Sequence, residues 1–470
     1  MRAALRPVAW LAIASGVAIT KADPDLWGHV RFGLDLLRDR VLHANDPYSY
    51  TRDREWVNHE WLSELIAAVA FRLGGPVGLI VMKVFIAVTL FWLVWRAVRD
   101  RAFAWRWGAM ALTAFVSLPL LLTARPQLWT LLGILITCRI LNSPSPRALW
   151  ALPLVFALWP NLHGGWLVGG GIIALWTAVA VVQRERRAWD LAATGTASLA
   201  ATLLTPYGLE MWRFLLETVR FGRTDISEWQ PIWKLGADSV LLWSATVVFL
   251  AYSWRRAGRP PVAIVVVLGA LALAAARVDR LGPLFGLAMV ILLARTWPAA
   301  DDALPLLRGR AVVDALAVVV GVAALLAMQP PPNCVAIDSV KGPDTVAAES
   351  LRGRTGRVAT FFDWGEYAIW QFGPALKVSL DGRRETVYSE DTLRQQTAIA
   401  TGSAVGLTVL ARAQPEYVWL PNESRATEDW LRMNGYRIDV RTARSFVAAR
   451  SDQAPLDPWE GRPSGCFPGP

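Results

Sequence analysis

Carboxyl and imidazole side chains are concentrated in one polar stretch, residues 21–64, between a short apolar segment and a long one. Three of the four histidines of the chain lie in this stretch, together with nine Asp and Glu residues. These groups are the commonest general acids and bases. A polar loop tied at both ends to apolar spans must lie in water or line a wet cavity. We therefore expect an active site here.

Asp25 and His29 form the first candidate pair. The segment Asp23-Pro24-Asp25 directly follows the apolar segment, and proline suits the first turn of a helix. Asp23 is then expected to cap a helix on which Asp25 and His29 lie one turn apart on one face. The pair is either a general base with a phosphate- or metal-binding neighbour, or an ordinary cap followed by an i,i+4 polar pair.

A second cluster consists of His59, Glu60 and Glu64. Glu60 and Glu64 also lie one helical turn apart, where like charges repel unless a cation lies between them. His29 and His59 could hold a divalent cation jointly with carboxylates. A bound metal ion is therefore an open alternative, and we predict no other cofactor. The spacing HExxxE differs from the HExxH of zinc peptidases, and no Cys/His spacing of a structural zinc site occurs.

The composition predicts a mainly α, polytopic membrane protein. The chain is 54% hydrophobic and 18% charged, whereas soluble domains are about 45–50% apolar and about 25% charged. Apolar runs lie near residues 5–20, 76–98, 104–123, 127–141, 149–160, 164–182, 190–204, 238–254, 261–276, 281–297 and 311–328. Several are shorter than the roughly 20 residues of a full span, so we expect about eleven transmembrane helices.

The connectors between these runs alternate in charge. One set carries clustered arginine, as at residues 96–106, 184–187 and 255–259, and the positive-inside rule places this set in the cytoplasm. The N-terminus is then cytoplasmic, and all four histidines and the last 140 or so residues are extracytoplasmic. This topology accounts for the net charge of +10 without a nucleic-acid partner.

Further polar residues lie at span ends on the predicted outer side. They are Arg125, Gln127, His163, Tyr207, Glu228, Gln230, Arg277, Asp279 and Arg280. The arginines either line a cavity or extend to the membrane surface, and Glu228 and Asp279 could simply pair with them. Trp27, Trp56 and Trp61 lie beside the acidic cluster and either belong to an interfacial belt or stack on a sugar ring.

The pattern changes after Gln329. Strand-like segments at 358–364, 375–382, 415–421 and 436–449 alternate with helical ones at 365–372, 389–402 and 426–435, which indicates a small, largely parallel α/β domain. We divide the chain into a membrane domain, 1–328, with a large first outer loop, 21–75, and an extracytoplasmic α/β domain, 329–470. Cys334 and Cys466 fall in a compartment that permits disulfides; either they are bonded or both are free thiols.

Several motifs between residues 20 and 300 resemble those of a bacterial branch of the GT-C type membrane glycosyltransferases. They are DPDLWGHVRFG, NDPYSYT, WVNHEWL, Arg125-Pro126, WPNLHGGW, TPYG and EWQP. The resemblance implies inverting transfer of a sugar from a polyprenyl-phosphate donor to a lipid, glycan or protein acceptor at the outer face of the bacterial inner membrane. Asp25 matches the catalytic aspartate and acts as general base, with Asp23 in reserve.

The resemblance and the outer-side placement together give the predicted site. Asp25, Asp23 and His29 are the catalytic candidates. The substrate-binding candidates are Trp27, His59, Glu60, Arg125, His163, Tyr207, Glu228, Gln230, Arg277 and Arg280. Arg125, Arg277 and Arg280 suit the donor phosphate. Two other classes compete: a transporter or flippase of a lipid-linked saccharide, which would carry charges along its spans and a repeat, and a non-catalytic assembly or sensor protein.

Overall fold

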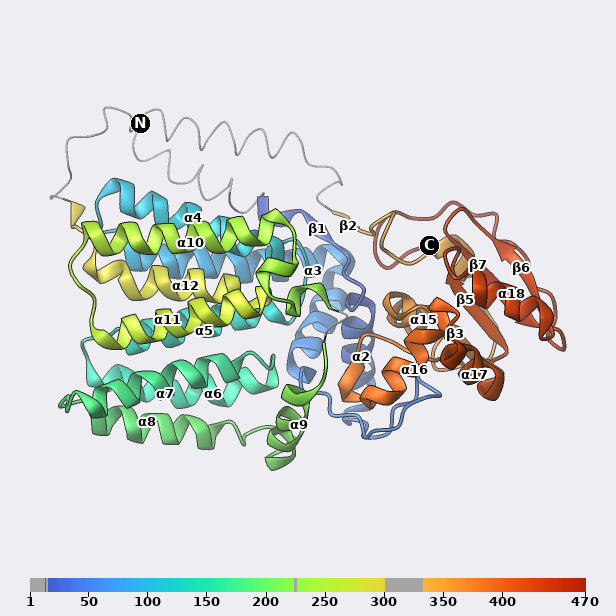
Figure 1. Ribbon diagram of the computed structural model, residues 1–470, viewed down its shortest axis with the longest axis horizontal. Helices are drawn as coiled ribbons and strands as arrows, with labels where there is room; N and C mark the ends of the chain where they lie inside the picture. Colours follow the sequence, from blue (N-terminus) through green and yellow to red (C-terminus); the bar gives the residue numbers. More distant parts are fainter. Residues whose placement is uncertain (1–12, 14–15, 224–225, 301–332) are drawn as a thin grey trace.

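The computed structural model describes residues 13, 16–223, 226–300 and 333–470. The predicted span near 311–328 lies outside the described residues, and so does most of the one near 5–20. The described chain has a helical part and, at one end of it, a part built on a β-sheet (Figure 1).

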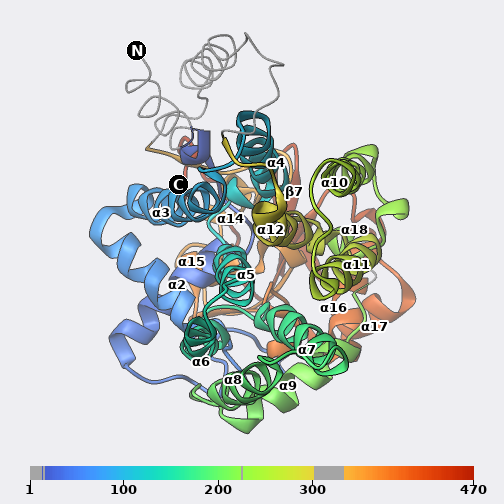
Figure 2. The same ribbon diagram turned by 90° about the vertical axis from the view of Figure 1, so that its left-hand side faces the viewer.

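The helical part is a bundle with α5 near its centre, as the view along the bundle in Figure 2 shows. Its helices are α3 (Trp61–Val98), α4 (Phe103–Leu121), α5 (Gln127–Leu141), α6 (Leu152–Leu158), α7 (Trp166–Val182), α8 (Ala188–Ala201), α9 (Leu209–Arg220), α10 (Ala237–Arg256), α11 (Val262–Arg277) and α12 (Gly282–Leu293). Most of these bounds follow the predicted apolar runs, because uninterrupted apolar sequence without a strand period favours helices. Helix α9 was not predicted as an apolar run.

Two of these helices, α3 and α10, are both long and apolar enough to cross a membrane. Helices α5, α7 and α11 are apolar but shorter. The count of about eleven spans stays a prediction. Helix α3 begins at Trp61, well before the predicted start at residue 76, and Gly75 interrupts it with a φ of 57°. Only glycine adopts such a φ freely, so Gly75 with Pro76 marks a break between two helical halves.

The predicted first outer loop is therefore partly helical. It contains α2 (Leu26–Asp39) and the first half of α3. Asp23 was expected to cap α2, but the N-cap residue is Asp25, whose own side chain makes no capping bond. The Asp23 carboxylate instead accepts the backbone N–H of Asp25 at 3.1 Å.

The C-terminal part contains a five-stranded sheet. Its strands are β3 (Gly356–Thr360), β4 (Leu376–Val378), β5 (Tyr417–Pro421), β6 (Tyr436–Arg441) and β7 (Ser445–Arg450), in the order β4-β3-β5-β7-β6. Its helices are α14 (Thr345–Glu349), α15 (Gly365–Phe372), α16 (Glu390–Thr401), α17 (Ala404–Ala413) and α18 (Arg425–Met433).

The sheet is mixed rather than largely parallel. β3 is parallel to β4 and β5, but β7 is antiparallel to both β5 and β6. The segment 436–449, predicted as one strand, folds into the β6–β7 hairpin, because three residues between the strands form a turn. Helix α17 was not predicted either.

The first outer loop packs directly on this sheet. Tyr50 donates its N–H to Val378 O at 3.1 Å, and Val378 donates to Tyr48 O at 2.9 Å, so the segment extends the edge of β4. Further along, β1 (Thr20–Lys21) is parallel to β2 (Val335–Ala336). One hydrophobic core holds residues of both parts: Trp27 and Trp56 come from the first loop, and Trp419 comes from the sheet. The boundary at residue 329 lies outside the described residues.

A disulfide bond joins Cys334 and Cys466, so of the two alternatives for these cysteines the bonded one is present. It fixes the C-terminal tail beside β2. Phe467 of the tail packs against the Trp27 ring, with ring centroids 5.5 Å apart. The tail therefore supports α2, the helix whose N-cap residue is Asp25.

Candidate functional site

A cavity of about 730 Å³ lies between the helical part and the C-terminal sheet. Helices α2 and α3 contribute to its wall with their N-terminal ends, and so do the connectors that precede α5 and α7. α9 and the loop that follows β4 complete it. Residues more than 300 positions apart in sequence thus meet in one space.

Eight of the predicted site residues line this cavity. They are Asp25, His29, His59, Glu60, Arg125, His163, Glu228 and Arg280. The structure therefore brings together both histidine–carboxylate clusters of the first loop and two of the three arginines assigned to phosphate.

The other predicted residues have structural partners instead. The buried Trp27 donates its indole N–H to Pro468 O at 2.9 Å, so it does not stack on a sugar. The Tyr207 hydroxyl accepts the N–H of Asn58 at 3.0 Å, and the Gln230 amide donates to the Arg223 carbonyl oxygen at 3.1 Å. Both side chains hold loops in place.

Arg277 does not share the cavity, which corrects the expectation that it would bind phosphate beside Arg280. Its guanidinium lies over the Trp233 ring, 5.7 Å from the centroid. Asp23, the reserve base, is also outside the cavity: it is buried and forms an ion pair with Arg125. The Asp23 carboxylate is therefore paired with a cation, whereas the Asp25 carboxylate has no ion-pair partner among the described residues.

The carboxylate of Asp25 lies at the cavity surface. Among the described residues, no side chain or backbone group hydrogen-bonds to its carboxylate, which borders the cavity. Burial raises the pKa of Asp25 to about 6, against the opposing charge of His29. The carboxyl group is therefore ionised at neutral pH while it keeps more basicity than an exposed aspartate.

His29 is a cation beside this base. Its Nδ1 lies 3.3 Å from Glu64 Oε1, and Asn58 donates to the other Glu64 oxygen at 2.5 Å. Burial acts to lower the pKa of His29, but the bond to Glu64 and the charges of Glu60, Glu64 and Asp25 outweigh it and raise the pKa to about 9. The side chain that His29 contacts is thus Glu64, on α3.

Glu366, on α15, is a second carboxyl group next to Asp25 that the sequence reasoning missed. It accepts the N–H of Gly28 at 3.0 Å. Burial raises the pKa of Glu366 well above its usual range, and Asp25 and Asp381 add to the effect. Glu366 therefore holds its proton more strongly than an exposed glutamate does, and a protonated Glu366 beside Asp25 would let the two carboxyl groups share a buried position.

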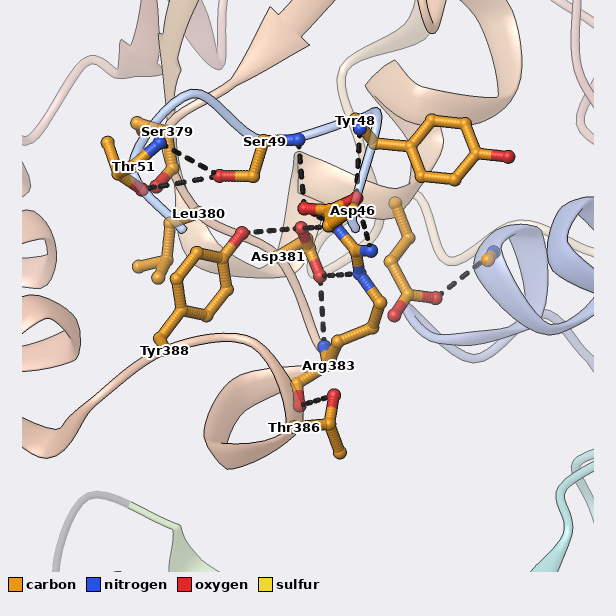
Figure 3. Close-up of polar contacts among 12 residues, drawn as sticks. Asp46, Tyr48, Ser49, Thr51, Ser379, Leu380, Asp381, Arg383, Thr386 and Tyr388 are labelled. Atoms are coloured by element: carbon orange, nitrogen blue, oxygen red, sulfur yellow. Dashed lines mark hydrogen bonds and ion pairs between the residues drawn. The ribbon is translucent and has the colours of Figure 1, made fainter. Parts of the chain in front are cut away.

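Arg383 joins the first loop to the segment that follows β4. Figure 3 shows the Arg383 guanidinium between Asp46 of the loop and Asp381. Its nitrogens lie 2.7 Å from Asp46 Oδ1 and 2.8 Å from Asp381 Oδ2, and the Tyr388 hydroxyl donates to Asp381 at 2.6 Å. The Phe32, Tyr48 and Trp56 rings surround the same guanidinium, Trp56 at 4.8 Å. A buried cation with two carboxylates and three rings is a fixed structural centre.

A group of arginines forms another side of the cavity. Arg280 donates to Glu228 at 2.6 Å, and Arg125 lies 3.9 Å from the same oxygen. The guanidinium groups of Arg223 and Arg280 lie 4.3 Å and 5.6 Å from the centroid of the Trp229 ring. Each of these guanidinium groups already pairs with a carboxylate: Arg125 with Asp23, Arg223 with Glu385 and Arg280 with Glu228. A guanidinium carries five N–H donors, so donors remain for an anionic ligand such as a phosphate.

One part of the wall is apolar. It includes Leu120, Leu131, Leu167, Val168, Phe214, Leu215, Leu281 and Leu284, from helices of the bundle and the 3₁₀ helix Asp279–Leu281. Such a surface suits a hydrocarbon chain. Within the described residues, no group of three or more His, Cys, Asp or Glu side chains is arranged to hold a metal ion.

The sequence matches no protein-family model and no curated protein. Among solved structures, the chain is similar to the apo oligosaccharyltransferase of Archaeoglobus fulgidus, with a TM-score of 0.59 and 11% identity over 95% of this chain and 74% of that one. It is also similar to the arabinofuranosyltransferase AftD from Mycobacteria, with a TM-score of 0.51 and 17% identity over 98% of this chain and 42% of that one. The chain has the fold of GT-C type membrane glycosyltransferases.

Proposed function

We propose that this chain is a membrane glycosyltransferase that moves a sugar from a polyprenyl-phosphate donor to a lipid, glycan or protein acceptor. The observation that carries the proposal is the single cavity in which an unpartnered carboxylate, a group of arginines and an apolar wall meet. The two structural neighbours are an oligosaccharyltransferase and an arabinofuranosyltransferase, which supports the same class.

Asp25 is the general base of this reaction. It takes the proton of the acceptor hydroxyl while the hydroxyl oxygen bonds to the anomeric carbon of the donor. The bond from that carbon to the phosphate oxygen breaks, and its electron pair leaves with the phosphate. One direct displacement inverts the configuration at the anomeric carbon.

Arg125 and Arg280 stabilise the leaving group. Negative charge grows on the phosphate oxygen as the bond breaks, and fixed guanidinium groups near it lower the barrier. Glu228, which contacts both arginines in this structure, would exchange part of these contacts for the phosphate. The polyprenyl chain would lie along the apolar wall near Leu120 and Leu284.

We place the cavity at the outer face of the bacterial inner membrane. The arginine-rich connectors support a cytoplasmic N-terminus and an extracytoplasmic C-terminal part. The bond between Cys334 and Cys466 supports the same orientation, because disulfides persist outside the cytoplasm.

The test uses the full chain in lipid nanodiscs with a panel of polyprenyl-phosphate-linked sugars and measures released polyprenyl phosphate, a product common to every donor and acceptor. We expect Asp25→Asn to lower the rate about 10²–10⁴-fold. Asp39→Asn is the matched control, since Asp39 lies on the same helix but bonds Arg38 and His43 at the surface. Full activity of Asp25→Asn together with an inactive Asp23→Asn would transfer the role to Asp23.

A further inference from the structure

A chain of hydrogen bonds fixes the imidazole of His163 at the cavity wall. Gly165 donates its backbone N–H to His163 Nδ1 at 3.1 Å. The Thr130 hydroxyl lies 2.7 Å from the same nitrogen, and Trp159 donates its indole N–H to that hydroxyl oxygen at 3.1 Å. The Trp159 and Gly165 N–H groups can only donate, so the Thr130 hydroxyl gives its proton to Nδ1.

This direction determines the tautomer. Because Nδ1 accepts two hydrogen bonds, the neutral ring carries its proton on Nε2. Burial supports the neutral form, since it lowers the pKa of His163 to about 3. An Nε2–H imidazole is a hydrogen-bond donor and has no free lone pair for a metal.

Three glycines make room for this arrangement. A Cβ atom at Gly165 would lie 2.2 Å from the Thr130 hydroxyl oxygen, and one at Gly133 or Gly169 would lie 2.5 or 2.6 Å from the Trp159 ring. Contacts this short are not tolerated in a packed interior. The backbone of α5 and α7 is therefore shaped around the hydrogen-bonded chain that ends at His163.

Glu60 lies opposite the fixed donor. Its Oε1 is 3.6 Å from His163 Nε2 and 3.6 Å from His59 Nε2, which is too long for hydrogen bonds. Glu60 occupies the N-cap position of α3 but makes no side-chain capping bond. Burial acts to raise the pKa of Glu60, yet the neighbouring histidines and Arg280 outweigh it and lower the pKa. Glu60 is an ionised acceptor with unused capacity.

We propose that His163 and Glu60 bind two neighbouring hydroxyl groups of an uncharged sugar ring, with His163 Nε2–H donating and the Glu60 carboxylate accepting. This inference rests on the proposed function and names the sugar class that the site selects. His29 and Arg280 already offset the charge of Glu60 itself. A uronic acid or a phosphorylated sugar bound here would bring a second negative charge next to the Glu60 carboxylate while His163 stays neutral, so it is disfavoured. The hydroxyl groups could belong to the donor sugar or to an acceptor glycan.

The proposal can be tested without turnover. The chain has only four histidines, so ¹⁵N-histidine labelling of the protein in nanodiscs gives few imidazole signals, and His163→Gln assigns the one of interest. We expect a neutral Nε2–H ring that does not titrate over about pH 5 to 8. Methyl α-D-mannopyranoside and methyl β-D-glucopyranoside serve as neutral probes, and D-glucuronate as the charged one.

A neutral glycoside should shift the His163 Nε2 signal, and glucuronate should not. Thr130→Val should weaken that shift, whereas Thr137→Val should leave it unchanged, since Thr137 lies on the same helix with a buried hydroxyl that has no partner among the described residues. A proton on Nδ1, ordinary titration of His163, an equal response to glucuronate, or no response to either glycoside would overturn the proposal. These outcomes do not depend on whether polyprenyl phosphate is released.

Turnover then separates the two sources of the hydroxyl groups. If the donor sugar occupies the site, Thr130→Val raises the KM for the donor and leaves that for the acceptor unchanged. If the acceptor glycan occupies it, the effect is reversed. An unchanged KM for both substrates would show that the subsite is not used in the reaction and would overturn the proposal.

Discussion

Asp25 Oδ1 and Glu366 Oε1 converge on one backbone position, that of Gly382. A Cβ atom there would lie 2.1 Å from the Asp25 oxygen and 2.8 Å from the Glu366 oxygen. The Asp25 carboxyl group of the first outer loop and the Glu366 carboxyl group of the C-terminal part are thus held against the same glycine. The proposed catalytic centre is shared between two parts of the chain that lie more than 300 residues apart.

Gly382→Ala should therefore displace Asp25 without removing any reacting group. The added methyl group cannot be accommodated unless one carboxyl group moves, and small displacements of a base lower the rate about 10²-fold. Polyprenyl phosphate release by the variant in nanodiscs measures the loss. Gly171→Ala is the control, because a Cβ atom at Gly171 meets nothing within 4 Å. Wild-type rates for Gly382→Ala would mean that Asp25 is not positioned by this contact.

The pH dependence of the rate should report Asp25. A base must be ionised, so we expect the rate to fall as the pH drops below the Asp25 pKa of about 6. The charge of His29 opposes the rise of that pKa, and His29 keeps its charge up to about pH 9.

His29→Gln should shift this acid limb to higher pH, because the neutral amide no longer favours the ionised form of Asp25. The rate–pH profile of the variant, measured under saturating donor, checks the shift. His43→Gln serves as control, since His43 is at the surface and pairs with Asp39. An acid limb that stays in place would show that another group controls ionisation.

The sequence predicted the bundle well because apolar runs bounded by polar connectors are a local signal. It also placed Asp25, His29, Glu60 and Arg125 on the same predicted side of the membrane, because the arginine content of the connectors assigns each connector to a side. The sequence could not show that Arg280 and Arg277 face different neighbours. Arg277 ends α11 and lies over Trp233, whereas Arg280, in the short 3₁₀ helix Asp279–Leu281, lines the cavity.

Glu366 and Arg383 could not be predicted in the same way. Their contacts with Gly28 and Asp46 span 338 and 337 residues. They depend on the first loop adding to the edge of β4, and no periodicity in either segment reports that pairing. The signals in the sequence were Asp46 in NDPYSYT and Asp381 and Arg383 in DGRRE, which read as loop residues until the two segments are seen together.

Arg383→Met should destabilise the whole junction. It leaves Asp46 and Asp381 buried without their counter-ion, a change that typically costs about 3–5 kcal/mol. Thermal unfolding of the purified chain, followed by tryptophan fluorescence, should show a clearly lower midpoint. Arg394→Met, which removes an exposed pair with Asp391, should change it little. Equal midpoints for both variants would mean that the cation does not hold the two parts together.

The disulfide between Cys334 and Cys466 should also stabilise the junction between the first outer loop and the C-terminal part. It closes a loop with a sequence separation of 132 residues, worth roughly 4–5 kcal/mol in the chain-entropy model. The tail that it fixes accepts the Trp27 indole N–H and packs on that ring, so the bond also steadies the start of α2. Replacing both cysteines with serine should lower the unfolding midpoint.

Non-reducing mass spectrometry of protein purified with a thiol-blocking reagent should recover the two peptides joined. Cys138→Ala is the control, because Cys138 is a buried free thiol in α5 and its removal leaves the bond intact. Alkylation of both Cys334 and Cys466 in intact membranes would contradict the bond. Protection of both from membrane-impermeant reagents after mild reduction would contradict the extracytoplasmic placement of the C-terminal part, and with it the face of the membrane on which transfer is proposed to occur.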